Sequence, residues 1–341
     1  MKAEKCYLKV EMQTLFVSTH LQCKNIHSNS ASFAVALSCF TLILWSGPSR
    51  FLPGYSDSLP TAQTRQGVAR GERWQTRDGR YFNVFRGIPF AKPPVQTRRF
   101  TLPEELDDED SWDGIVHFNR DVPKCYQSDM MLGGMDVGRE DCLHLNVYSP
   151  DLQPESPLPV MVWIHGGGFV IGSGSSVVQG PGFFMDHDVV VVSINYRLGI
   201  FGFLSLETDD APGNLGLWDQ RMALVWVRKN IAYFGGDPNR VTIFGESAGS
   251  MSVNFHLLSP QSRGLFHQAI MQSGTAISTY TNLNRSPRHY SMSLADKLGC
   301  GKSDNVLRCL QEVPAKTLHQ HLFDFDQCAI NRNIGLTFPG K

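Results

Sequence analysis

The stretch Gly-Glu-Ser-Ala-Gly at residues 245–249 follows the apolar run Val-Thr-Ile-Phe at residues 241–244. This order predicts a strand that turns sharply into a helix and holds the hydroxyl of Ser247 out of the backbone, as in the G-x-S-x-G nucleophile elbow. The turn needs a glycine on each side, because larger side chains there would collide with the strand and the helix. The pattern alone is weak in a chain with 31 glycines, but the apolar strand before it and the small residues after it favour a nucleophile.

A second glycine-rich segment, His-Gly-Gly-Gly at residues 165–168, follows the apolar run at residues 160–164. Glycines that leave a sheet in succession allow two amides to face one pocket without obstruction by Cβ atoms. Ester hydrolysis passes through a tetrahedral oxyanion, which backbone N–H groups stabilise. We expect Gly167 and Gly168 to supply two of these groups and Ala248, directly after the serine, to supply the third. A phosphate loop would end in Gly-Lys-Ser or Gly-Lys-Thr, which this segment lacks.

The histidine that would activate the serine is not evident in the sequence. His165 is a candidate base, but we expect it to orient its loop, because a hydrolase of this kind carries its catalytic histidine last in the chain. Three histidines further along the chain are also candidates, but none lies in a sequence typical of a catalytic histidine: His289, His319 and His321. A serine without a neighbouring base is a poor nucleophile.

The composition indicates a well-buried globular core and argues against several classes of partner. The chain has 341 residues, of which 42% are apolar and 18% charged, and its net charge is -1. Its Lys and Arg residues are scattered, so we expect no nucleic-acid partner. The one dense charge block, residues 104–110, is interpreted as a solvated loop. No cysteine pair has C-x-x-C spacing, so we predict no metal site, and we expect no cofactor.

The first 47 residues are predicted to be a leader. An apolar core at residues 31–45 is followed by Ser-Gly-Pro, which is typical of a secretory signal cleaved near Gly47. The polar segment before that core is long, which leaves two alternatives: a retained signal-anchor, or true initiation at Met12. The core is shorter than the roughly 20 residues of a membrane span, so we favour secretion, and a membrane contact only if residues 31–45 are retained. Residues 48–66 are predicted to be a linker and residues 67–341 the N-terminal portion of a folded domain.

Eight cysteines agree with an oxidising compartment. Three lie in the leader and Cys328 is left over, whereas four form two pairs that are close in sequence. Each pair could close a short loop as a disulfide, although spacing alone does not prove a pairing. The cysteines of the leader and of the two close pairs are Cys6, Cys23 and Cys39, Cys125 with Cys142, and Cys300 with Cys309.

The pattern along the rest of the chain predicts an α/β fold. A hairpin is expected at residues 72–85 around Asp78-Gly79, and a helix at residues 219–234. Further strands are expected at residues 143–148, 160–164, 189–194, 241–244 and 268–272, with a helix from Ala248 to about Leu257. The runs at 160–164 and 189–194 are continuously apolar, as in central strands covered on both faces. This alternation implies a mostly parallel sheet flanked by helices.

Several long motifs resemble the type-B carboxylesterase and cholinesterase family. They are EDCLHLNVY (140–148), HGGGF (165–169), NYRLGIFGFL (195–204), GNLGLWDQRMALVWV (213–227) and FGGDPNRVTIFGESAG (234–249). The resemblance covers about residues 67–341 and implies an α/β-hydrolase fold and serine-dependent hydrolysis of small-molecule carboxylic esters. It also implies that Ser247 is the nucleophile, that Gly167, Gly168 and Ala248 form the oxyanion hole, and that the pairs Cys125–Cys142 and Cys300–Cys309 are disulfides.

Departures from the family pattern favour a general carboxylesterase. Cholinesterase-like members carry a tryptophan in the first disulfide loop, where a quaternary ammonium group stacks, but residues 126–141 contain none. Val170 stands where cholinesterases have a tyrosine. Glu246 stands where the juvenile-hormone-esterase-like branch has glutamine, and its role is left open between a structural one and tuning of the field beside the serine.

The family's acid and histidine lie more than a hundred and more than two hundred residues after the serine. This chain ends at Lys341, 341 − 247 = 94 residues after Ser247. We therefore expect both groups, and the later strands of the sheet, to lie beyond residue 341, which leaves an open apolar sheet edge. The alternative function is an inactive, truncated or adhesion-type relative that binds a protein partner. The retained serine argues against that alternative.

Overall fold

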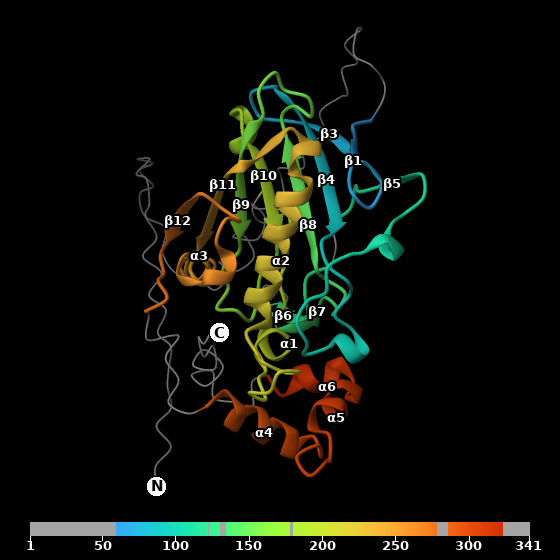
Figure 1. Ribbon diagram of the computed structural model, residues 1–341, viewed down its shortest axis with the longest axis vertical. Coiled ribbons are helices and arrows are strands. Elements are labelled where there is room, and N and C mark those ends of the chain that lie inside the picture. Colours follow the sequence, from blue (N-terminus) through green and yellow to red (C-terminus); the bar gives the residue numbers. More distant parts are fainter. Residues whose placement is uncertain (1–58, 122, 130–133, 178–179, 278–285, 323–341) are drawn as a thin grey trace, which may run out of the picture. The chain divides into compact units, whose positions relative to one another are not determined.

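The computed structural model describes residues 59–121, 123–129, 134–177, 180–277 and 286–322 (Figure 1). All of them belong to one compact unit, residues 57–341. The predicted leader at residues 1–47 and Cys328 lie outside the described residues.

A seven-stranded sheet in the order β12-β11-β9-β10-β8-β4-β3 forms the centre of the fold (Figure 1). Its strands are β3 (Glu72–Gln75), β4 (Tyr81–Pro89), β8 (His144–Ser149), β9 (Leu158–Ile164), β10 (Val190–Ile194), β11 (Gly236–Glu246) and β12 (Gln268–Gln272). The four strands from β12 to β10 run parallel, which confirms the predicted parallel sheet. The antiparallel part is larger than the predicted hairpin, because β8 pairs with both β10 and β4.

The predicted N-terminal hairpin is present as β3 and β4. Gly79 adopts a φ of 89°, and its N–H donates to the carbonyl of Thr76 at 3.1 Å. The N–H of Thr76 in turn donates to the carbonyl of Arg80 at 2.8 Å. Glycine is required at this turn because the backbone enters the left-handed region.

A short strand lies within the segment that was predicted to be a linker. Strand β1 (Thr61–Gln63) lies inside the segment assigned to a linker, residues 48–66, and pairs with β2 (Val68–Arg70), which pairs in turn with β5 (Ile115–His117). The linker prediction is therefore wrong for residues 61–63. A three-residue strand is too short to show a hydrophobic period, so composition alone could not reveal it.

Helix α2 (Leu215–Asn230) begins at Leu215 rather than at the predicted Asp219, and the 3₁₀ turn η5 (Ile231–Phe234) continues it to the predicted end. Asp219 and Gln220 are fully buried in the middle of this helix. Buried polar residues interrupt the apolar pattern, which is why the first turn was missed. Gly235, with a φ of 80°, ends the 3₁₀ turn.

Helices α2 and α3 (Ala248–Leu258) pack against β11 and contribute to one hydrophobic core. The remaining helices are α1 (Gly199–Phe203), α4 (Pro287–Lys297), α5 (Val306–Glu312) and α6 (Ala315–Gln320), and the short 3₁₀ turns are η1 (Gln96–Arg98), η2 (Asp108–Asp110), η4 (Phe184–Asp186) and η6 (Pro260–Ser262). A second core forms between α1, α4, α5 and α6.

The prediction that the two central strands are covered on both faces is confirmed for β10 and wrong for β9. Every residue of β10 is buried, whereas Met161 and Trp163 of β9 are only half-buried. Strand β12 pairs with β11 on one side and is the last strand of the described sheet. Its Ile270 and Met271 are each 44% exposed, so this edge carries apolar surface.

Both cysteine pairs are disulfides in the structure. Cys125–Cys142 closes the loop that contains β6 (Gln127–Asp129) and β7 (Met135–Val137), and Cys300–Cys309 links the end of α4 to α5. Among the described helices, none combines the length and the apolar character that a bilayer crossing requires. In the same residues, no group of three or more His, Cys, Asp and Glu side chains is arranged to hold a metal ion.

A buried ion pair joins the segment after β10 to helix α2. The guanidinium of Arg197 donates to both carboxylate oxygens of Asp219, at 2.8 and 2.7 Å, and to the carbonyl of Thr101 at 2.9 Å. The side chains of Arg197 and Asp219 are 3% and 0% exposed. Because both charges are removed from water, each depends on the other for compensation.

Removing one member of this pair should destabilise the fold strongly. We expect Arg197→Met to lower the free energy of unfolding by about 3–5 kcal/mol, because Asp219 is left buried and uncompensated. The double variant Arg197→Met/Asp219→Leu should be more stable than Arg197→Met alone. Urea unfolding followed by circular dichroism measures both, and equal stability of the single variant and the wild type would contradict the expectation.

Candidate active site

Ser247 lies at the turn between β11 and α3, where the sequence predicts a nucleophile elbow. Its backbone has φ 56° and ψ −120°, a combination that non-glycine residues rarely adopt. Its N–H donates to the carbonyl of Gln272 at 2.9 Å, and its carbonyl accepts from the N–H of Met251 at 3.0 Å. The surrounding hydrogen bonds therefore hold a strained residue in one conformation, as is common at functional sites.

Three glycines allow the elbow to pack directly against the end of β9. A methyl group on Gly249 would lie 2.0 Å from the carbonyl oxygen of Ile164, and one on Gly245 would lie 2.6 Å from the same atom. A methyl group on Gly166 would lie 2.5 Å from the carbonyl oxygen of Glu246. No larger residue fits at these three positions without movement of the backbone. The glycine segment and the elbow are consequently in contact.

The glycine segment adopts a left-handed backbone that glycine accepts and larger residues rarely do. Gly167 has φ 106° and Gly168 has φ 61°, and a methyl group on Gly167 would lie 2.2 Å from the carbonyl oxygen of Ile171. Within the described residues, no acceptor binds the N–H groups of Gly167 and Gly168. Ala248 is the first residue of α3, and the first N–H groups of a helix have no intrahelical partner. These amides remain available to an anion.

His165 is fixed within its loop. Its ring stacks on Tyr196 with centroids 4.3 Å apart, its Nδ1 donates to the carbonyl of Gly166 at 2.8 Å, and its own carbonyl accepts from the Tyr196 hydroxyl at 2.8 Å. Burial lowers the pKa of His165 to about 4, so the ring is neutral at neutral pH. All these contacts fix the position of the loop, as expected if His165 orients it.

The other candidate histidines have different surroundings. His319 Nε2 lies 2.9 Å from the hydroxyl of Ser128 and 3.3 Å from the carboxylate of Asp136, and its ring packs on Tyr126. His289 packs on Tyr290, and His321 follows α6. In the part of the chain that the structure describes, no histidine hydrogen-bonds to the hydroxyl of Ser247. Glu246 is exposed, and its side chain lies beside Gly166.

A buried hydrogen-bond chain supports the elbow from behind. The hydroxyl of Ser252 donates to the carbonyl of Ala248 at 2.9 Å, and the amide of Gln220 donates to Ser252 at 3.0 Å. His256 Nε2 donates to the Gln220 oxygen at 3.0 Å, and its Nδ1 accepts from the hydroxyl of Ser262 at 2.8 Å. Burial lowers the pKa of His256 to about 4. This chain joins α2 to the first turns of α3.

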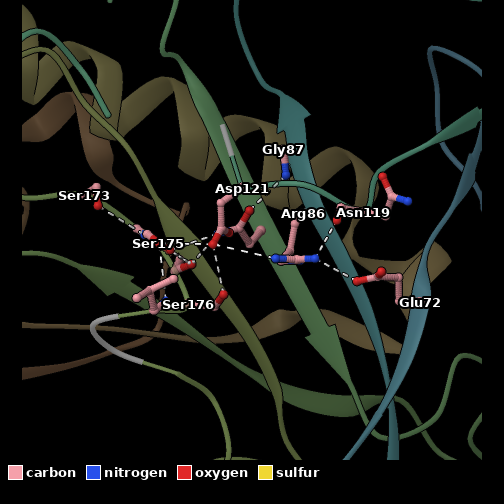
Figure 2. A network of polar contacts seen from close by, with 12 residues as sticks. Glu72, Arg86, Gly87, Asn119, Asp121, Ser173, Ser175 and Ser176 are labelled. Carbon is pink, nitrogen blue, oxygen red and sulfur yellow. Dashed lines mark hydrogen bonds and ion pairs between the residues drawn. The ribbon is translucent and has the colours of Figure 1, made fainter. Parts of the chain in front are cut away.

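Sequence reasoning missed the residues that hold the segment after the glycines. Gln127 donates to the carbonyl of Gly172 and accepts from its N–H, both at 2.8 Å. Asp121 accepts hydrogen bonds from the hydroxyls of Ser175 and Ser176, both at 3.0 Å, as Figure 2 shows. These pairs are about 50 residues apart in the chain, and no short motif marks such contacts.

Strand order and the serine turn together define a protein of the α/β-hydrolase class. Residues 58–334 match the model of the carboxylesterase family, and this chain belongs to that family. The resemblance drawn from the motifs is therefore confirmed.

Several curated relatives are similar over about four-fifths of the chain. A juvenile hormone esterase of Tribolium castaneum is 47% identical over 81% of this chain, and an acetylcholinesterase of Trittame loki is 39% identical over 82%. The pyrethroid hydrolase Ces2a of Mus musculus is 43% identical over 76%. These alignments cover 47%, 53% and 48% of the respective relatives, so the chain spans about half the length of the curated relatives it matches.

Adding one methyl group to the elbow should disrupt it. We expect Gly249→Ala to lower the free energy of unfolding by roughly 1–3 kcal/mol or more, because the new Cβ would lie 2.0 Å from the Ile164 carbonyl oxygen. Gly182→Ala is the matched control, since nothing lies within 4 Å of its Cβ position. Thermal unfolding of both variants measures the difference, and equal effects would contradict the packing argument.

Acid should destabilise the fold through His165 and His256. The unfolded chain binds protons on histidine near pH 6.5, whereas the folded protein resists protonation of both rings down to about pH 4. The contribution of the two rings to the free energy of unfolding is therefore fully present above about pH 6.5. It falls toward pH 4 by about 1.4 kcal/mol per pH unit for each ring. Urea unfolding at several pH values measures the slope. In His256→Gln one ring is absent, so the slope of the free energy of unfolding against pH should fall by the contribution of one proton. An unchanged slope would contradict the expectation that His256 is buried in its neutral form.

Proposed function

We propose that this protein is a secreted serine carboxylic ester hydrolase, a general carboxylesterase that acts through an acyl-enzyme on Ser247. The observation that carries the proposal is the strained backbone of Ser247 (φ 56°, ψ −120°) in contact with the glycine segment at residues 165–168. A hydroxyl at such a turn is exposed to substrate, and unpaired amides lie on the loop beside it. Membership of the carboxylesterase family supports the class of reaction.

In the proposed reaction, Ser247 Oγ attacks the ester carbonyl and its proton passes to a histidine. The negative charge moves to the carbonyl oxygen, where the N–H groups of Gly167, Gly168 and Ala248 stabilise it. Collapse of the tetrahedral intermediate expels the alcohol, which takes the proton from the histidine. Water then attacks the acyl-serine by the same route, releases the carboxylic acid and restores the hydroxyl.

The histidine and its acidic partner lie, in this proposal, in sequence that follows residue 341. Two observations support that placement. The described histidines have other partners or surroundings, and the matched relatives are about twice as long as the aligned part of this chain. The proposal therefore places the acid and the histidine outside the residues that the structure describes.

The proposed substrate is a small-molecule carboxylic ester, with no cofactor and no nucleic-acid partner. The first disulfide loop, residues 126–141, contains no tryptophan to bind a quaternary ammonium group. The two disulfides are typical of an oxidising compartment, which supports secretion. Contact with a membrane would require that residues 31–45 are retained as an anchor.

A fluorophosphonate probe tests the proposal, since it phosphonylates an activated serine and mimics the tetrahedral intermediate. We expect the complete natural protein to be labelled at Ser247, and Ser247→Ala to abolish labelling while the fold is kept. Mass spectrometry of the labelled peptide identifies the site, and circular dichroism verifies the fold of the variant. Hydrolysis of p-nitrophenyl acetate should be lost in parallel.

The absence of labelling in folded, complete protein would overturn the proposal. It would favour the alternative, an inactive relative that binds a protein partner through the same fold. Labelling that persists in Ser247→Ala would equally contradict the assignment of the nucleophile.

A further inference from the structure

The segment that follows Gly167 and Gly168 is bound by side chains from other parts of the chain. We use the term oxyanion loop for residues 165–176. Its beginning is fixed by β9 and by contact of Gly166 with the elbow. The loop then folds back on itself, so that a methyl group on Gly172 (φ 116°) would lie 2.3 Å from His165 Nδ1. The position of Gly172–Ser176 therefore constrains the position of the glycines before it.

The backbone of this loop is unusual and needs external support. Gly167, Gly168, Phe169 and Gly172 all have positive φ values, between 61° and 116°, which glycine adopts readily and phenylalanine does not. A residue such as Phe169 keeps a positive φ only when surrounding contacts support it. Polar contacts from other segments supply that support: the backbone of Gly172 is bound by Gln127, and the N–H of Gly174 donates to Asn195 at 2.8 Å.

Asp121 provides the one charged contact among these supports in the described structure. It lies four residues after β5, in a segment that runs along β4, and its Oδ2 accepts from the hydroxyls of both Ser175 and Ser176 at 3.0 Å (Figure 2). Hydrogen bonds to an ionised carboxylate are roughly twice as strong as those between neutral groups. A single side chain thus fixes two consecutive residues of the loop.

Arg86 on β4 keeps Asp121 in place. Its guanidinium lies 3.7 Å from the same carboxylate oxygen, 2.8 Å from the carboxylate of Glu72, and 4.8 Å above the ring of Trp74. It also donates to the carbonyl of Asn119, two residues before Asp121. The side chains of Arg86 and Asp121 are only 17% and 18% exposed. Opposite charges at this separation and burial attract each other more strongly than they would in water.

We propose that Asp121 is a positioning residue for ester hydrolysis: together with Arg86 it fixes Ser175 and Ser176, and so holds the amides of Gly167 and Gly168 toward the oxyanion. The inference rests on the proposed function, since the oxyanion role belongs to that reaction. Asp121 itself touches neither Ser247 nor the glycines. Its effect on the site passes through the oxyanion loop, because Asp121 contacts only the end of that loop.

The test compares four forms of the complete natural protein by the kinetics of fluorophosphonate labelling. Asp121→Ala removes both serine contacts, Asp121→Asn keeps an acceptor oxygen without the charge, and Glu72→Gln is the matched control, because Glu72 binds Arg86 but does not contact the loop. A misplacement of about 1 Å can cost about 10²-fold in rate. We expect Asp121→Ala to lower the maximal labelling rate about 10- to 100-fold and to leave the binding constant of the probe within about twofold.

The labelling rate of Asp121→Asn should lie between those of Asp121→Ala and the wild type, and Glu72→Gln should be labelled at the wild-type rate. A general loss of stability would not produce this order, because it would lower the amount of folded protein but not the labelling rate of the protein that remains folded. A wild-type rate in folded Asp121→Ala would overturn the inference. If Asp121→Ala fails to fold, the double variant Ser175→Ala/Ser176→Ala removes the same contacts from the other side, and a wild-type rate there would overturn it as well.

Hydrogen exchange separates this inference from the proposed function. We expect the amides of residues 166–176 to exchange faster in Asp121→Ala than in the wild type, while those of β10 remain unchanged. This readout does not depend on activity. If the wild type is not labelled, the proposed function fails, and the exchange rates alone decide the positioning role. Unchanged exchange at residues 166–176 would overturn that role.

Discussion

The close approach between the end of β9 and the first turn of α3 is the constraint on which the candidate site depends. Gly245 and Gly249 both lie against the carbonyl of Ile164, at distances that leave no room for a Cβ atom. This approach forces the chain to reverse within a few residues, and the reversal gives Ser247 its strained backbone. The same approach brings the glycine segment that leaves β9 into contact with the elbow. Ser247 and the amides of the glycine segment are thus positioned by one packing contact.

Strain at one point requires support from several directions, and the structure provides it with polar contacts. Behind the elbow, Gln220 and His256 connect α2 to the helix that begins at Ala248. Beside it, Gln127 and Asp121 hold the oxyanion loop. These groups are buried or nearly so, where an unpaired polar atom is costly, and each therefore specifies a single arrangement. The cost of such an arrangement is sensitivity to acid, because buried neutral histidines become protonated when the protein unfolds at low pH.

Much of the fold followed from local patterns. Alternation of apolar runs with helical periods predicted the parallel strands and helices α2 and α3, and Asp78-Gly79 predicted the hairpin. The errors have physical causes. The first turn of α2 was missed because Asp219, a buried partner of Arg197, interrupts the apolar pattern, and β1 was missed because three residues show no period. The half-buried side chains of β9 were missed because an apolar run does not say what covers each face of a strand.

The sequence by itself determined the chemistry of the candidate site: which serine stands between two glycines, which glycines leave a strand together, and which cysteines are near one another. Such features are local, because they depend on backbone freedom and short spacing. Only the tertiary structure decided which distant side chains hold these elements, as Asp121 holds Ser175 and Arg197 holds Asp219. These contacts join residues that are about 20 to 50 positions apart, and many polar pairings in a chain satisfy the same chemistry. Packing of the sheet selects one of them.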